Sequence, residues 1–157
     1  MGSEMCIRDR AYQCRMQKIP LATEADTLAL GAQLAPVLKA GDVIALTGGL
    51  GAGKTSLARG LIQSVLGPCE VPSPTYTLVQ CYDLPAYELW HCDMYRLKQP
   101  EDGYELGLID AFEEAVCLIE WPDKLGDFMP ETALSIHIEF EGEGRSAHLR
   151  GFGDRLG

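Results

Sequence analysis

The sequence lacks long hydrophobic runs and is short of basic residues. No stretch of about eighteen apolar residues occurs, the length that a helix needs to cross a bilayer. Lysine and arginine number 13 against 23 aspartates and glutamates, so the formal net charge is -10. A protein that grips nucleic acid unaided usually has a basic face that displaces counterions from phosphates. The composition therefore argues against a membrane protein and against direct binding of DNA or tRNA by this chain alone.

Paired cysteine motifs are also missing. Six cysteines are scattered along the chain without a C-x-x-C pair, which favours neither a disulfide framework nor a structural zinc site. We expect reduced, partly buried thiols. With no recognisable signal peptide, the expected location is cytoplasmic.

The length of 157 residues fits one domain with a single main core. The opening "MGSEMCIRDRAYQCR" has no apolar periodicity and is typical of non-native or disordered sequence. We therefore expect residues 1–15 to be an extension, Met16 to be a plausible natural start, and residues 16–157 to form one domain.

The first predicted elements are a strand and a helix. "MQKIPLA" has the composition of a short strand ending at Pro20, and Thr23 with Asp26 three residues later is an N-terminal capping pattern. The helix is expected over about 24–39, with Pro36 kinking or shortening it. Its apolar face is predicted to comprise Leu28, Leu34, Ala35 and Leu38.

The rest of the chain alternates strands and helices. "DVIALTG" and "AVCLIEW" are typical of buried strands, and a helix is predicted from Lys54 to about Leu66. "YTLVQCYD" and "YELWHCDMY" predict a hairpin or two neighbouring strands, and the chain ends in two alternating strands around "GEG". The segment "PEDGYELGLIDAFEE" predicts short helices and turns. Together these indicate a three-layer α/β domain with a mixed, largely parallel sheet and a C-terminal β-hairpin.

A phosphate-binding motif lies between the buried strand and the helix. "GGLGAGKT", residues 48–55, satisfies G-x-x-x-x-G-K-[ST], and its place after a strand and before a helix is typical of a P-loop. Its glycines let backbone N–H groups surround an anion, and the helix adds its positive end. In such a loop Lys54 neutralises the β and γ phosphates of the nucleotide and the Thr55 hydroxyl ligates Mg²⁺.

Two acids are candidates to complete the metal site. Glu120 ends the apolar run "AVCLIE" and Asp93 ends "YELWHCD". Either could instead be a solvent-facing carboxylate at a strand end. The run His91, Cys92, Asp93 also raises a zinc site, but neighbouring residues of a strand point to opposite faces and no second ligand pair occurs elsewhere. We therefore expect no zinc, with Cys92 in the core and His91 either structural or supporting the residues of the site.

Further absences separate the classes of P-loop protein. The chain has no asparagine, which disfavours the N-K-x-D guanine-reading loop of small GTPases. It has no arginine between residues 97 and 130, where a small-molecule kinase usually carries an arginine-bearing lid.

Several stretches together resemble one family, the bacterial ATPases of tRNA threonylcarbamoyladenosine biosynthesis, TsaE (formerly YjeE). They are "GGLGAGKTSLARG", "VPSPTYTLVQCY", "HCDMYRL", "ELGLIDAF", "CLIEWPDKLGDFMP" and "GEGR", in the family's order over about residues 22–146. The resemblance implies a P-loop NTPase domain that binds ATP and Mg²⁺. It also implies a slow hydrolase that works with the TsaB and TsaD proteins, which would make most of the contact with tRNA.

The resemblance also implies roles for individual residues. Lys54, Asp93 and Glu120 are expected to be catalytic, with Thr55 and Glu120 as metal ligands. Ser73 and Thr75 resemble a switch-like loop near the γ-phosphate, or form a proline-stiffened turn. Trp121 is expected either to pack near the nucleotide or to anchor the core. The start of the helix, Thr23 to Thr27, resembles the family segment that lies beside the adenine. The expected nucleotide-binding residues are Gly48, Gly49, Leu50, Gly51, Ala52, Gly53, Lys54, Thr55, Ser56 and Arg145.

One departure from the family and two other functions stay open. The family commonly has aspartate where this chain has Gly49, which could alter the rigidity of the loop. A nucleotide-dependent binding module would use ATP to close the loop around Ser73 and Thr75, with incidental hydrolysis. A small-molecule kinase would transfer the phosphate to a nucleoside or sugar.

Overall fold

The computed structural model describes residues 16–49 and 51–152. The predicted extension, residues 1–15, and Leu50 of the glycine loop lie outside the described residues. In chain order the elements are β2 (Met16–Leu21), α1 (Glu24–Leu34), η2 (Ala35–Val37), β3 (Val43–Thr47), α2 (Lys54–Leu66), β4 (Val79–Asp83), β5 (Glu88–Asp93), α3 (Glu101–Glu105), α4 (Leu108–Glu114), β6 (Val116–Glu120), η3 (Pro122–Phe128), β7 (Leu134–Glu141) and β8 (Gly144–Arg150).

The strands within the described residues form one mixed, seven-stranded sheet in the order β2-β8-β7-β3-β6-β5-β4. The predicted hairpins are confirmed, because β4 pairs antiparallel with β5 and β7 with β8. The expectation of a largely parallel sheet is corrected. In the part of the chain that the structure describes, only β3 with β6, β3 with β7 and β5 with β6 pair in parallel. The two hairpins, and β2 added antiparallel to β8 at one edge, make up the other pairings.

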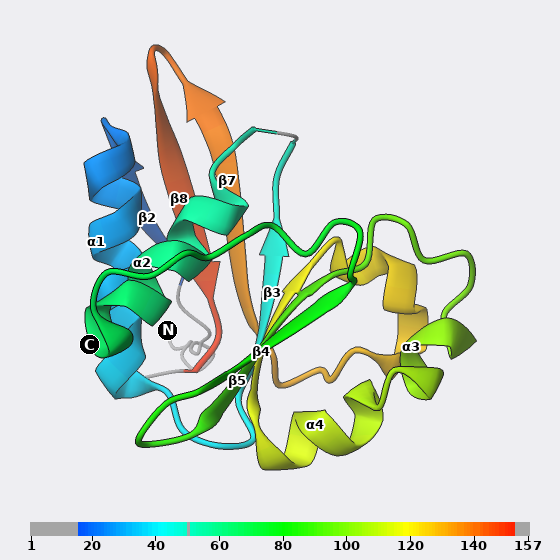
Figure 1. Cartoon of the computed structure of the whole chain (residues 1–157). Coiled ribbons are helices and arrows are strands. Elements are labelled where there is room, and N and C mark those ends of the chain that lie inside the picture. The colour runs from blue at the N-terminus through cyan, green and yellow to red at the C-terminus, as the bar shows by residue number, and fades with distance from the viewer. Residues whose placement is uncertain (1–15, 50, 153–157) are drawn as a thin grey trace, which may run out of the picture.

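Helices cover both faces of the sheet, as Figure 1 shows: α1 and α2 lie on one side, α3 and α4 on the other. The alternation of side chains along β6 reflects this arrangement. Val116 and Leu118 belong to the core beneath α1 and α2, whereas Cys117 and Ile119 belong to the core beneath α3 and α4. A strand buried on both faces reads as a continuous apolar run. None of the described helices is both long and apolar enough to cross a bilayer.

Helix α1 begins as predicted but ends earlier. The Thr23 hydroxyl accepts from the Asp26 N–H, and the Asp26 carboxylate accepts from the Thr23 N–H, which completes a capping box. The helix ends at Leu34 rather than near residue 39, because Pro36 cannot donate an intrahelical hydrogen bond and the chain tightens into the 3₁₀ turn η2. The buried face is also corrected: Leu28 is only half-buried. The buried residues of α1 are Thr27, Leu30, Gly31 and Leu34.

Two glycines allow α1 and α2 to pack closely. A Cβ atom on Gly60 would lie 2.1 Å from the Leu28 carbonyl oxygen, and one on Gly31 would lie 2.1 Å from the Leu57 carbonyl oxygen. Real carbon atoms do not approach backbone oxygen so closely, so a larger residue at either position must push the helices apart. The contact therefore fixes how α2, which begins at the glycine loop, sits on the sheet.

We expect Gly60→Ala to destabilise the protein although alanine is the better helix former. Overpacking costs roughly 1–3 kcal/mol, which outweighs the gain in helix propensity of about 1 kcal/mol when the obstacle is rigid backbone. Urea unfolding followed by circular dichroism measures the difference. The matched control is Ala29→Leu at an exposed position of α1, for which we expect a change within about 0.5 kcal/mol. A Gly60→Ala protein as stable as the wild type would contradict the close packing.

The four described cysteines are free thiols, and Cys92 and Cys117 are buried. Desolvation by burial raises the pKa of Cys117 to about 12 and holds the pKa of Cys92 well above its ordinary value. Both side chains belong to the core beneath α3 and α4. The prediction that Cys92 faces the core is therefore confirmed, and at neutral pH both groups stay protonated and unreactive.

Candidate functional site

The principal pocket lies where three parallel strands end. Strands β3, β6 and β5 are neighbours, and their carboxyl ends meet at one edge of the sheet. The crevice beyond such strand ends is where open α/β sheets bind ligands. The pocket has a volume of about 260 Å³. It is lined by Gly49, Gly51, Ala52, Gly53, Lys54, Thr55, Ser56, Ser73, Thr75, Asp93, Glu120 and Trp121.

The glycine loop joins β3 to α2 and forms one wall of this pocket. Gly48 has φ 141° and Gly53 has φ 114°, values that L side chains rarely adopt. A Cβ on Gly48 would also lie 2.4 Å from the Ile138 carbonyl oxygen. Gly49 differs, because its φ is not positive and a Cβ there would meet nothing within 4 Å. The aspartate that the family commonly carries at this position would therefore fit.

Lys54 opens α2 and turns its ammonium back beneath the loop. Its Nζ donates to the carbonyl oxygens of Gly48 at 2.7 Å and Gly49 at 3.2 Å. Only 6% of the residue is exposed. Desolvation lowers the pKa of Lys54, and the negative charges of Glu120 and Asp93 oppose that shift. The two acids thus favour the charged form of the lysine that an anionic ligand requires.

Strand alternation directs both predicted acids into the pocket. Glu120 lies on the face of β6 that carries Val116 and Leu118. Asp93 lies on the face of β5 that carries Leu89. These three apolar residues belong to the core beneath α1 and α2. The two acids are register partners in the parallel pair of β5 and β6. Glu120 is 3% and Asp93 4% exposed. Neither is a solvent-facing strand-end carboxylate.

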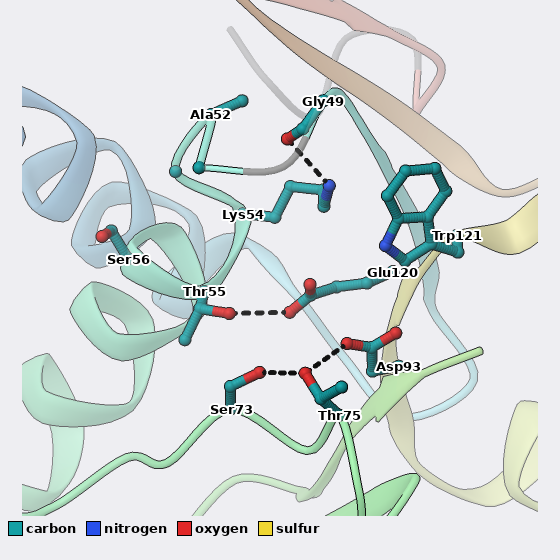
Figure 2. Close-up of a pocket in the computed structure, with 12 residues that line it drawn as sticks. Gly49, Ala52, Lys54, Thr55, Ser56, Ser73, Thr75, Asp93, Glu120 and Trp121 are labelled. Carbon is teal, nitrogen blue, oxygen red and sulfur yellow. Dashed lines mark hydrogen bonds between the residues drawn. The ribbon is translucent and has the colours of Figure 1, made fainter. Parts of the chain in front are cut away.

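Glu120 is held by donors from two elements. The Thr55 hydroxyl donates to Glu120 Oε2 at 3.2 Å, and His91 Nε2 lies 2.7 Å from the same oxygen. Thr55 comes from the first turn of α2 and His91 from β5. The two contacts therefore join α2 and β5 at the carboxylate that ends β6. Figure 2 shows Thr55 and Glu120 pointing toward each other across the pocket.

Asp93 binds the loop that contains the predicted switch residues. Its Oδ2 accepts from the Thr75 hydroxyl at 3.1 Å, and Thr75 is hydrogen-bonded to the Ser73 hydroxyl at 2.8 Å (Figure 2). Its Oδ1 accepts from the Tyr95 N–H at 2.9 Å. The loop rejoins β4 through Leu78, whose φ of 71° costs a non-glycine residue roughly 1–3 kcal/mol. Ser73 and Thr75 therefore line the pocket, and Thr75 is hydrogen-bonded directly to the acid that the resemblance marks as catalytic.

Trp121 forms the far wall of the pocket. The residue has φ 57°, so the chain turns sharply after Glu120. Its indole lies 4.3 Å from Lys54 Nζ and packs against the ring of Tyr95 with centroids 4.9 Å apart. The ring also contacts the core beneath α3 and α4. Trp121 is therefore a core contact, as one of the two interpretations has it, and it also lines the pocket, where packing near a nucleotide stays a prediction.

A second, smaller cleft adjoins the first. It is about 180 Å³ in volume and is lined by Thr23, Glu24, Thr27, Gly51, Gly53, Ser56 and Arg145. Arg145 donates to the Gly51 carbonyl oxygen at 3.1 Å and stacks on Phe140 with its Cζ 4.6 Å from the ring centroid. Ser56 faces this side, where its hydroxyl donates to Glu24 Oε2 at 3.0 Å. The segment Thr23 to Thr27, which resembles the family segment beside the adenine, and Arg145, an expected nucleotide-binding residue, therefore share one cleft.

The chemistry of the pocket suits a phosphate chain and a hard divalent cation. The loop, the N-terminus of α2 and the Lys54 ammonium supply positive potential for anionic oxygens. Opposite them, Thr55, Glu120 and Asp93 supply oxygen ligands of the kind that Mg²⁺ prefers. The two acids are buried with hydroxyl and imidazole partners rather than with an arginine or lysine ion pair among the described residues. These residues fit Mg²⁺ bound with a nucleotide.

The sequence predicted residues that the structure brings together, but it did not predict two of their contacts. Its candidates gather in the two adjoining clefts, apart from Leu50, which lies outside the described residues, and Gly48, whose carbonyl holds Lys54. The partnership of His91 with Glu120 and that of Tyr95 with Asp93 and Trp121 were not predicted. The period of two already placed His91 on the face of Asp93. Its acceptor, however, lies on another strand, and only the register of β5 with β6 reveals it.

Comparison with known proteins gives consistent matches. A family model described as "Threonylcarbamoyl adenosine biosynthesis protein TsaE" matches residues 21–147. The chain is 39% identical over 108 residues to the tRNA threonylcarbamoyladenosine biosynthesis protein TsaE of Haemophilus influenzae, covering 68% of each chain. The TsaE protein of Nostoc is 36% identical over 144 residues, 88% of each chain. The crystal structure of Bacillus subtilis YdiB superposes with a TM-score of 0.77 at 28% identity, covering 93% of this chain and 92% of that one.

Proposed function

The chain belongs to the TsaE family of threonylcarbamoyl adenosine biosynthesis proteins, and on that premise we propose that it binds ATP with Mg²⁺ and hydrolyses it slowly during the modification of tRNA. The observation that carries the proposal is the convergence of Lys54 and Thr55 with two buried acids from the ends of β5 and β6. A P-loop NTPase requires this combination of phosphate cradle and carboxylate.

Each residue has a distinct task in the proposed reaction. Lys54 and the loop hold the β and γ phosphates, and Arg145 with the segment Thr23 to Thr27 lines the side on which the base or ribose lies. Thr55 and Glu120 would hold Mg²⁺, which when bound neutralises charge on the phosphate oxygens. Asp93 positions the attacking water and accepts its proton as the bond between the γ-phosphorus and the β,γ-bridging oxygen breaks.

Partners complete the proposal. By resemblance, the protein works with the TsaB and TsaD proteins in the cytoplasm, and these partners make most of the contact with tRNA. The net charge of -10 supports this division, because an acidic chain is a poor stand-alone RNA binder. Hydrolysis by a component that does not itself transfer the threonylcarbamoyl group would reset the complex between turnovers.

ATP hydrolysis by the purified protein tests the proposal. We expect slow phosphate release from the protein alone and stimulation of about tenfold or more, equivalent to about 1.4 kcal/mol of barrier, when TsaB, TsaD and tRNA are all present. Omitting any one of the three is the control. Absence of hydrolysis under every condition would contradict the proposal, and so would faster transfer of the phosphate to a nucleoside or sugar than to water.

One observation favours a second candidate, a nucleotide-dependent binding module. Ser73, Thr75 and Asp93 form a hydrogen-bonded chain from the exposed loop to the pocket. A γ-phosphate that rearranged this chain would move Tyr76, which is 80% exposed at the tip of the same loop. In that case nucleotide binding alone would control docking of partners, and hydrolysis would be incidental.

A further inference from the structure

His91 is the most completely enclosed polar residue of the site. It is 0% exposed and lies on β5, two residues before Asp93 and on the same face. Its Nε2 atom is 2.7 Å from Glu120 Oε2. Its Nδ1 atom is buried without a hydrogen-bond partner among the described residues. Burying a polar ring is unfavourable unless it is hydrogen-bonded, so the contact of Nε2 with Glu120 is the interaction that favours a histidine at this position.

The contact with Glu120 assigns the hydrogen of the ring. An ionised carboxylate only accepts hydrogen bonds, so Nε2 must carry the hydrogen that joins the two groups. The opposite tautomer would place two acceptors 2.7 Å apart. The neutral Nε2–H tautomer leaves only a lone pair unmatched at Nδ1, whereas a second N–H there would be an unpaired buried donor.

The contact also distinguishes the two oxygens of Glu120. Both donors, His91 Nε2 and the Thr55 hydroxyl, reach Oε2. Within residues 16–49 and 51–152, Oε1 has no hydrogen-bond donor. Two bonds from different directions to one oxygen fix the rotation of the carboxylate about its last torsion, which is otherwise broad.

We infer that His91 is a positioning residue, which holds Glu120 through Nε2–H so that Oε1 stays available to the ligands of the pocket. The inference rests on the proposed function, because it assigns to Glu120 a metal or a water as its counterpart. It also has a consequence for Thr55. When the Thr55 hydroxyl turns toward a cation, the bond from His91 is the one that keeps the carboxylate in place. Partners of this kind orient metal-binding side chains in many sites.

A spectroscopic test uses the full-length protein without nucleotide. The chain has three histidines, His91, His137 and His148, so long-range proton–nitrogen NMR on ¹⁵N-histidine protein can be assigned with single substitutions. We expect His91 to show the neutral Nε2–H tautomer, with a slowly exchanging ring proton whose signal moves in Glu120→Ala. An Nδ1–H tautomer, or a signal unaffected by Glu120→Ala, would overturn the inference. This readout stands even if the protein hydrolyses no ATP, which would refute the proposed function instead.

Matched variants separate positioning from packing. His91→Leu keeps most of the side-chain volume but removes the donor, His91→Gln keeps an N–H donor, and Cys92→Ala perturbs the next residue of β5 on the opposite face. We expect His91→Leu to raise the Mg²⁺ concentration for half-maximal ATP hydrolysis about tenfold or more, while ADP affinity measured in EDTA changes less than about twofold. His91→Gln should recover part of the loss, and Cys92→Ala should leave the Mg²⁺ dependence unchanged.

Two results of the variant experiment would overturn the inference. One is a wild-type Mg²⁺ dependence in His91→Leu. The other is an equal rise in all three variants, which would show that β5 responds to any change of packing. If His91→Leu does not fold, the comparison of His91→Gln with the wild type and the NMR tautomer decide the matter.

Discussion

Replacing Lys54 with alanine is expected to lower ATP hydrolysis on the order of 10²–10³-fold, the usual effect of removing one preorganised electrostatic contact from a transition state. The ammonium already points into the pocket, held by the Gly48 and Gly49 carbonyl oxygens and by the ring of Trp121. It therefore needs little rearrangement to meet phosphate oxygens. ATP affinity should fall as well, because no other lysine or arginine lines the principal pocket among the described residues.

A second substitution distinguishes charge from packing at this position. Lys54→Met keeps an unbranched side chain against Trp121 but has no charge, and we expect it to be as inactive as Lys54→Ala. Lys98→Ala, at an exposed lysine away from the pocket, is the control. Phosphate release and equilibrium binding of a fluorescent ATP analogue provide the measurements. Hydrolysis in Lys54→Met near the wild-type rate would show that the buried cation serves the fold rather than the nucleotide.

The sequence predicted those parts of the site that are written in local patterns. The glycine loop between Val43–Thr47 and Lys54–Leu66 was found with its flanking elements, because the motif needs residues that are near one another in the chain. Glu120 and Asp93 were found because an acid that ends an apolar run is itself a local pattern. The capping box at Thr23 is local for the same reason.

The parts that depend on pairing between distant segments were not predictable. The local sequence around Leu89 in β5 or around Cys117 in β6 does not indicate that these two strands are parallel neighbours. Their pairing register nevertheless brings His91 to Glu120. The balance of parallel and antiparallel pairs was misjudged for a related reason, since a strand such as Met16–Leu21 can join either edge of a sheet. Helix α1 was predicted too long because apolar periodicity continues through Leu38 although the helix does not.

Replacing Asp93 with asparagine is expected to leave ATP bound but not hydrolysed. Asparagine has the same shape, its amide oxygen can accept from the Tyr95 N–H, and its NH₂ group can donate to the Thr75 hydroxyl, so both present contacts of Asp93 have a replacement. It cannot accept a proton from water at neutral pH. We expect hydrolysis to fall on the order of 10²–10⁴-fold, the range for a lost general base, with ATP affinity within about threefold of the wild type.

The same variant changes the electrostatics around Lys54. The Asp93 charge is one of the two charges that oppose the lowering of the Lys54 pKa by desolvation, so without it the pKa of Lys54 should fall further. Any loss of ATP binding should therefore grow as the pH rises, because the ammonium deprotonates more readily. The control is Asp83→Asn, an exposed acid at the end of β4.

Asp93→Asn also decides between the two functions proposed for the site. If this variant associates with TsaB and TsaD in the presence of ATP but supports only one round of tRNA modification, hydrolysis resets the complex. If it supports repeated rounds, nucleotide binding is sufficient and the protein is a binding module.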